Sequence, residues 1–202
     1  MELIEVIRKR RSIRKYKPDP VPDEYIRKIM EAARLAPSGT NLQPWRFVVV
    51  KSAEKRRELA QHTLEFVATA PVVVACCIDI TAYKYTPQRI KELTDAGAFT
   101  GIDMGAFGGD EYMKKRQAMD ENALRAYASL NCAISIEHLI LRATDLGLGT
   151  CWVMMFKQNG VKEVLKLGES IQVVALVPVG YADQDPAPRP RLPMEDLLIQ
   201  EV

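Results

Sequence analysis

Residues 71–80 form an almost unbroken apolar run, Pro-Val-Val-Val-Ala-Cys-Cys-Ile-Asp-Ile, which predicts a strand buried in the core. A second run at 171–179 and shorter ones at 45–51 and 150–155 predict further strands. Apolar residues recur at helical spacing over 2–8, 23–35, about 53–66 and about 121–145. Strands and helices therefore alternate, and no apolar stretch approaches the roughly 20 residues that span a bilayer.

The composition fits one globular domain covering residues 1–202. With 202 residues, 48% hydrophobic and 27% charged, the chain is neither disordered nor too short to build a core. A formal net charge of +2 gives no reason to expect nucleic-acid binding. The four cysteines form no Cys-x-x-Cys pair and there are two histidines, so we expect neither a metal site nor a disulfide framework. The N-terminus has no secretory pattern, and a cytoplasmic protein is predicted.

A dense basic segment follows the first predicted helix. Seven cations and no acid lie between residues 8 and 17, namely Arg8, Lys9, Arg10, Arg11, Arg14, Lys15 and Lys17. Such a cluster repels itself unless an anion binds there, and arginines beside the Ser12 hydroxyl suit a phosphate monoester. A solvated basic face is the alternative. Arg189 and Arg191 lie in a proline-rich strip, 181–193, that is predicted to run extended across the surface.

Two further segments combine small, amide and aromatic residues. The first, Ala-Pro-Ser-Gly-Thr-Asn-Leu-Gln-Pro-Trp at 36–45, has amide groups that can recognise the polar edge of a heterocycle. The simpler alternative is a turn between a helix and a strand. The second, Leu-Gly-Leu-Gly-Thr-Cys-Trp-Val-Met-Met at 146–155, lacks the third glycine of a dinucleotide-binding fingerprint, which disfavours a Rossmann fold.

Taken in this order, the segments resemble the FMN-dependent nitroreductase family. The resemblance rests on Arg-Arg-Ser-Ile-Arg-Lys-Tyr at 10–16, Pro-Ser-Gly-Thr-Asn-Leu-Gln-Pro-Trp at 37–45, Ala-Pro-Val-Val-Val at 70–74 and Leu-Gly-Leu-Gly-Thr-Cys-Trp at 146–152. It closes with Val-Gly-Tyr at 179–181 and Arg-Pro-Arg-Leu-Pro at 189–193. It covers nearly the whole chain except about 81–120.

The resemblance implies an α+β fold with a central, mostly antiparallel mixed sheet flanked by helices, in an intertwined homodimer with FMN at the interface. The basic motif and the tail arginines would hold the flavin phosphate and ring edge, with Arg14 near flavin O2 and N1. Residues 37–43 would come from the partner chain, and residues 152–155 would lie along the ring. The implied cofactor-binding residues are Arg10, Arg11, Ser12, Arg14, Pro37, Ser38, Gly39, Asn41, Gln43, Trp152, Val153, Met154, Met155, Arg189 and Arg191.

The implied activity is that of an NAD(P)H-dependent oxidoreductase. Two electrons would pass from NADH or NADPH to a small electron-poor acceptor such as a nitroaromatic or a quinone. No catalytic side chain is expected, because the flavin carries the chemistry. The alternatives are a specialised family member that fragments flavin or removes halogen, a non-catalytic FMN-binding or storage protein, and an anion-binding module.

The segment 81–120, where the resemblance fails, is predicted to be a variable, lid-like insertion that selects the acceptor. It is rich in glycine and charge, which suits a segment that bends over a site. The alternative is a mobile surface excursion with one or two short helices. Phe99, Phe107 or Tyr112 would offer an aromatic surface to a planar substrate.

Overall fold

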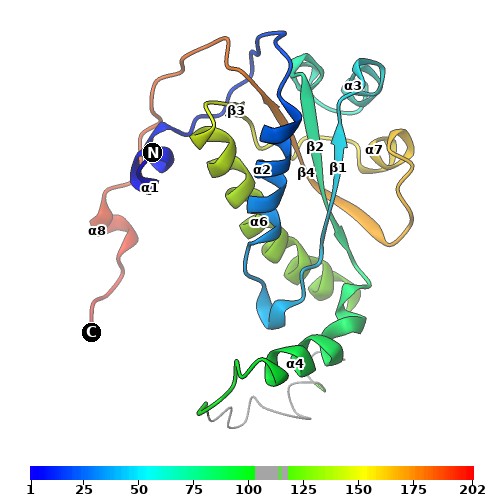
Figure 1. Cartoon of the computed structure of the whole chain (residues 1–202), viewed down its shortest axis with the longest axis vertical. Coiled ribbons are helices and arrows are strands. Elements are labelled where there is room, and N and C mark those ends of the chain that lie inside the picture. The colour runs from blue at the N-terminus through cyan, green and yellow to red at the C-terminus, as the bar shows by residue number, and fades with distance from the viewer. Residues whose placement is uncertain (103–113, 115–117) are drawn as a thin grey trace.

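The computed structural model describes residues 1–102, 114 and 118–202. Within that part the chain forms a four-stranded sheet with helices on both faces (Figure 1). The strand order is β1 (Trp45–Val50), β2 (Val72–Asp79), β4 (Ile171–Gly180), β3 (Gly149–Thr150), and every pair is antiparallel. The α+β fold is confirmed. Within the described residues of one chain the sheet is antiparallel rather than mixed, since the parallel pairing there is an isolated bridge between Ser12 and Thr150.

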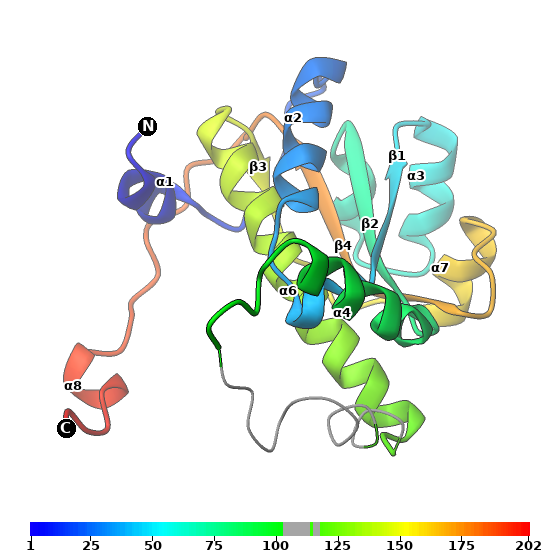
Figure 2. The same cartoon turned by 60° about the horizontal axis from the view of Figure 1, so that its bottom comes forward.

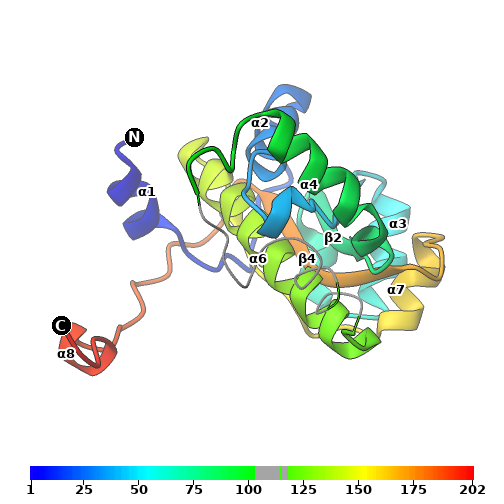
Figure 3. The ribbon, with the colours of Figure 1, turned by 90° about the horizontal axis from the view of Figure 1, so that it is seen from below.

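The helices form two layers around the sheet. On one face lie α2 (Asp23–Arg34) and α6 (Glu121–Asp145), and on the other lie α3 (Ala53–Ala60), the short 3-10 helix η2 (Glu65–Thr69) and α7 (Gln158–Val164). At the bottom of Figure 1, and toward the viewer in Figure 3, η3 (Ala82–Tyr85) leads into α4 (Thr86–Asp95), which lies against η1 (Gly39–Asn41). The terminal helix α1 (Leu3–Lys9) meets the body chiefly at α6, whereas α8 (Met194–Leu197) stands away from it (Figure 2).

The central strand β2 is apolar along its length because both of its faces are covered. Val72, Val74, Cys76 and Ile78 pack among the residues of α2 and α6, whereas Val73, Ala75 and Cys77 pack on the side of α3 and α7. Successive side chains of a strand point to opposite faces, so a strand between two helix layers needs apolar residues at every position. This is the physical origin of the run at 71–80.

Two predicted elements are shorter in the structure than in the sequence analysis. The helix predicted over about 53–66 ends at Ala60, and a separate 3-10 turn begins at Glu65. The strand predicted over 150–155 contributes only Gly149–Thr150 to the sheet. Beyond it, an isolated bridge between Val153 and Leu176 keeps the same antiparallel register. In the predicted lid, η3 and α4 are described, while Phe107 and Tyr112 lie outside the described residues.

The two ends of the chain present apolar side chains to solvent. The exposed fractions of Leu3, Ile4 and Ile7 on α1 are 65%, 53% and 47%. Met194, Leu197 and Leu198 in and after α8 are 53–69% exposed. The strip from 183 to 193 is extended, as the prolines predict, and carries α8 away from the sheet (Figure 1). The apolar face of α1 was predicted, and within a single chain it packs little against the core.

The four cysteines lie in the core as free thiols, and we predict that they are unreactive in the native protein. Burial raises the pKa of Cys77 and of Cys132 to about 12, and it also raises the pKa of Cys76 and Cys151. Since the thiolate is the reactive form, native protein should give no fast phase with Ellman's reagent at pH 8. Denatured protein should give four equivalents. A fast-reacting thiol in the native state would contradict the described packing.

The helices of the described part of the chain include none that is both long and apolar enough to cross a membrane.

Candidate cofactor site

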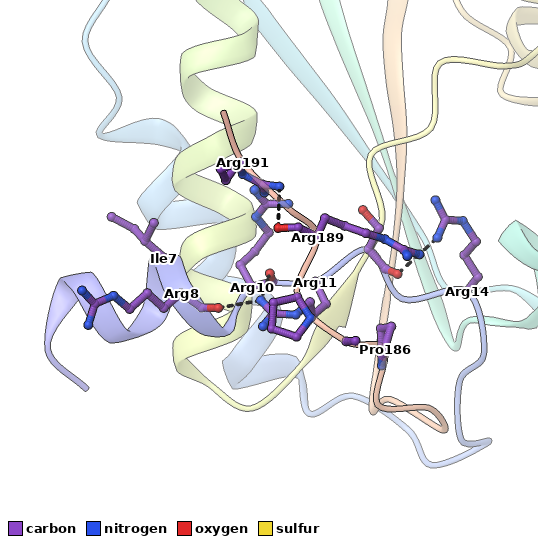
Figure 4. A pocket seen from close by; sticks show the side chains of 11 residues that line it. Ile7, Arg8, Arg10, Arg11, Arg14, Pro186, Arg189 and Arg191 are labelled. Atoms are coloured by element: carbon purple, nitrogen blue, oxygen red, sulfur yellow. Dashed lines mark hydrogen bonds between the residues drawn. The ribbon is translucent and has the colours of Figure 1, made fainter. Parts of the chain in front are cut away.

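A basic pocket of about 490 Å³ lies between the N-terminal segment and the C-terminal strip. The arginines that line it come from both ends of the chain, and Figure 4 shows Arg10, Arg189 and Arg191 gathered between α1 and the strip. Its lining residues are Ile7, Arg8, Arg10, Arg11, Ser12, Arg14, Pro186, Ala187, Pro188, Arg189 and Arg191. The structure therefore brings together two arginine groups that are about 180 residues apart in sequence. The two groups must meet in this way if they are to hold one phosphate group together.

The charge in this pocket is uncompensated. None of its described lining residues is acidic, and within the described residues none of its arginines forms an ion pair. The guanidiniums of Arg11, Arg14 and Arg191 donate instead to backbone carbonyls of their own segments. Like charges held together repel, so this arrangement favours an anionic ligand with several acceptor oxygens.

The basic segment is held against the edge of the sheet. The N–H of Ile13 donates to the carbonyl of Thr150 at 2.8 Å, and the hydroxyl of buried Tyr16 donates to the carbonyl of Ile13 at 2.6 Å. A Cβ at Gly149 would lie 2.7 Å from the Ile13 side chain, so only glycine allows this approach. Gly149 therefore lets the basic segment approach the sheet, and the segment from Ser12 to Arg14 runs directly beside residues 149–151.

Residues 152–155 leave the sheet next to this basic segment. Val153 is buried, whereas Met154 and Met155 are 67% and 70% exposed. Among the described residues, the N–H groups of these two methionines have no protein acceptor, and the indole Nε1 of Trp152 is buried without one. The unpaired N–H groups of this segment can donate to acceptor atoms at the edge of a flat ligand, and the exposed methionine thioethers can pack against its face. Thr63, which the sequence analysis did not select, donates its hydroxyl to the Met155 carbonyl at 2.7 Å.

The segment 36–45 is conformationally strained and internally bonded. Thr40, Asn41 and Gln43 have φ values of 52°, 51° and 50°, in the left-handed region that non-glycine residues rarely adopt. The Gln43 N–H donates to Ser38 Oγ at 3.0 Å, and Gln43 Nε2 donates to Asn41 Oδ1 at 2.9 Å. Because backbone strain concentrates at functional sites, this geometry favours a binding loop over a plain turn.

Within one chain this loop does not reach the basic pocket. Pro37, Ser38, Gly39, Asn41 and Gln43 are absent from the described lining of the pocket. They lie instead beside α4 at the bottom of Figure 1, where the Gly39 N–H donates to Asn131 Oδ1 on α6. The structure thus brings Arg10, Arg11, Ser12, Arg14, Arg189 and Arg191 together, with Ser12 and Arg14 beside Thr150 and Cys151, and keeps the loop residues apart from them.

Comparison with known proteins matches this arrangement to one family over most of the chain. Residues 7–181 match the model of the nitroreductase family. The chain belongs to the nitroreductase family. An NADH dehydrogenase of Thermus thermophilus is 34% identical over 95% of this chain and 92% of its own length. A putative NAD(P)H nitroreductase of Streptococcus pyogenes is 29% identical over 98% of this chain and 98% of its own length. The family assignment made from the sequence is therefore confirmed, and the chain is an enzyme of the NAD(P)H nitroreductase and flavin oxidoreductase family.

Solved structures of the nitroreductase family have the same fold. A family protein from Streptococcus pneumoniae superposes with a TM-score of 0.79 at 29% identity, covering 99% of this chain and 100% of that one. A protein of Exiguobacterium sibiricum in complex with FMN gives a TM-score of 0.80 at 24% identity, covering 100% and 98%. The nitroreductase-like fold is therefore confirmed.

Part of the pocket wall of this nitroreductase-family chain was not predicted from the sequence. Arg8, Pro186, Ala187 and Pro188 line the pocket although none was selected as a site residue. The signal was present, because Arg8 opens the basic segment and the three strip residues immediately precede Arg189. No group of three His, Cys, Asp or Glu side chains suited to a metal ion occurs among the described residues.

Proposed function

We propose that this chain binds FMN in the basic pocket and transfers two electrons from NADH or NADPH to a small electron-poor acceptor. The observation that carries the proposal is the convergence of arginines from residues 8–14 and 189–191 on a pocket whose described lining holds no acid. A phosphate monoester supplies the charge and acceptor oxygens that this lining lacks. The uncompensated arginines, the Ser12 hydroxyl and the unpartnered Trp152 indole N–H together fit a phosphorylated heterocycle.

Each group of residues has a defined role in this proposal. Arg10, Arg189 and Arg191, assisted by Arg11 and Ser12, hold the phosphate and the adjoining chain. Arg14 lies close enough to Cys151 to lower the pKa of that thiol against the effect of burial, so it stands beside the segment that leads to Trp152. It is placed to counter negative charge at the ring edge, and residues 152–155 lie along the ring. FMN, when bound, supplies the hydride and electron chemistry.

We propose further that the active form is a homodimer in which the loop 37–43 completes the partner's site. Two observations support it. The strained loop lies away from the basic pocket of its own chain. The exposed apolar residues of α1 and of the α8 region make a surface that monomeric proteins seldom leave in water. Leu130 and Ile134, one turn apart on α6, are likewise 64% and 37% exposed.

The colour of the purified protein tests the proposed function. We expect a yellow protein that takes up one FMN per chain and is bleached by NADH or NADPH without oxygen, with colour returning when a quinone or nitroaromatic is added. No catalytic side chain is needed for these steps, because solvent can supply the protons. Yellow protein that no nicotinamide donor bleaches would indicate FMN storage instead. Colourless protein that cannot be loaded with FMN would refute the proposal.

A further inference from the structure

A second pocket, of about 450 Å³, lies between the strained loop and the start of the predicted lid. Its floor is apolar, since Leu42, Trp45 and Ala82 are all buried. Its walls come from β1 on one side and from η3 and α4 on the other, at the bottom of the molecule in Figure 1. The volume is in the range of small-molecule sites, so it accommodates a ring-sized ligand.

The polar side chains of this pocket carry positive charge and no described negative charge. Arg46 and Arg89 line it from opposite walls, with the amides of Gln43 and Gln88 beside them. No acidic residue occurs in its described lining. Each arginine already faces one carboxylate: Asp79 forms an ion pair with Arg46 at 3.7 Å, a distance too long for a hydrogen bond, and Glu92 pairs with Arg89. Asp79 also accepts from the N–H and the hydroxyl of Thr81 at 2.9 and 2.7 Å.

Arg89 leaves a donor unused in this wall. One terminal nitrogen of its guanidinium pairs with Glu92 at 2.5 Å, which fixes the side chain along α4. Its Nε–H is buried and has no acceptor among the described residues. A buried donor without an acceptor is costly, so a ligand oxygen placed there gains a charge-assisted hydrogen bond. Tyr85, half exposed at the rim, adds an aromatic surface for a planar ring.

From this geometry we propose that the pocket binds the anionic group of a reactant, with Arg46 and Arg89 as the residues that select for charge. Gln43 belongs both to this pocket and to the loop that completes the partner's flavin site. That the pocket lies near a flavin rests on the proposed function, because the loop is proposed to reach the partner's site. That the pocket binds an anion rests only on residues of this one chain. The anion can be the carboxylate of an aromatic acceptor or the 2′-phosphate of NADPH.

The experiment compares reactants that differ in one charge. We expect Arg89→Gln and Arg46→Gln each to lower the kcat/KM ratio of 4-nitrobenzoate to 4-nitrobenzamide about tenfold, as loss of one charge-assisted contact predicts. Arg89→Lys should restore part of that ratio. Lys84→Gln is the matched control, because Lys84 is an exposed cation on η3 outside the lining, and it should leave the ratio unchanged. If the arginine variants instead lower the ratio of kcat/KM for NADPH to kcat/KM for NADH, the anion is the 2′-phosphate of NADPH.

A binding measurement separates failure of the pocket from failure of the flavin site. Benzoate cannot be reduced, so calorimetric titration with benzoate and benzamide reports binding with or without FMN. We expect benzoate to bind the wild-type protein about tenfold more tightly than benzamide does, and to lose this advantage in Arg89→Gln. The proposal is wrong if the two arginine variants change neither the two kcat/KM ratios (4-nitrobenzoate to 4-nitrobenzamide and NADPH to NADH) nor the affinity for benzoate. It is also wrong if Lys84→Gln changes these quantities as much as the arginine variants do. The same variants should take up FMN normally. If the wild-type protein and every variant fail to bind FMN, the proposed flavin site is wrong and not the anion pocket.

Discussion

Replacing Arg10 and Arg191 together with alanine is expected to weaken FMN binding by at least a hundredfold. Each guanidinium supplies a charge-assisted hydrogen bond worth about 1.5–3 kcal/mol, and about 1.4 kcal/mol corresponds to a factor of ten. The two residues reach the pocket from opposite ends of the chain, so neither can replace the other. Fluorescence titration of apoprotein with FMN measures the effect. Folding should be retained, because Arg191 is exposed and forms no ion pair with a described residue.

Riboflavin and a distant arginine provide the controls for this prediction. Riboflavin lacks the phosphate, so it should bind wild-type protein far more weakly than FMN does and should lose little in the double variant. Arg57→Ala removes an exposed guanidinium from α3, across the sheet from α1, and should leave FMN binding unchanged. If wild-type protein bound FMN and riboflavin equally tightly, the basic segment would not bind the phosphate, and its alternative interpretation as a solvated basic face would hold.

Placing acidic residues on the two protruding helices should produce a monomer that has lost FMN. Ile4 and Leu197 are 53% and 57% exposed in the single chain, so burying the exposed half of each contributes about 0.75–1.5 kcal/mol. The double variant Ile4→Asp, Leu197→Asp removes four of these contributions from a dimer and adds four charges. The dissociation constant of the dimer should therefore rise by at least about 10²-fold. Sedimentation velocity with detection of flavin absorbance measures assembly and cofactor together.

The matched control for the dimer variant is Ala53→Asp. Ala53 is exposed at the first position of α3, where a carboxylate suits the helix N-terminus, so this protein should stay dimeric and yellow. In wild-type protein, FMN should raise the melting temperature through its preferential binding to the folded dimer. A monomer that still binds FMN tightly would show that the loop 37–43 is not supplied by the partner.

The two arginine segments could be recognised from the sequence because each has an unusual composition. Charge density marked residues 8–17, and the prolines around Arg189 and Arg191 predicted an extended strip. Only the resemblance to the nitroreductase family implied that the two segments meet, and the structure brings them together in one pocket. The pocket around Arg46 and Arg89 was not predictable in this way, since each arginine stands singly in its own element and only the packing of α4 on η1 joins them.

The elements that the sequence analysis misjudged are those whose limits depend on contacts between distant residues. The helix after residue 53 stops early because the next residues pair with another segment: Lys157 N–H donates to the His62 carbonyl at 2.7 Å, and Thr63 forms a bridge with Phe156. Helix α7 was not predicted, as it is one short segment that contains Gly160. That glycine is needed because a Cβ there would lie 2.2 Å from His62 Nδ1.

The strand order has a consequence for how the chain is made. β2 ends at Asp79, and its second neighbour, β4, begins only at Ile171. At typical rates of translation, roughly 5–20 s pass between the synthesis of these two strands. During that time the most apolar strand of the protein has β1 on one side and an open hydrogen-bonding edge on the other, which is the template for pairing between chains. The unfinished chain on the ribosome is therefore especially prone to aggregate, and the exposed edge of β2 is the surface that a chaperone would need to shield.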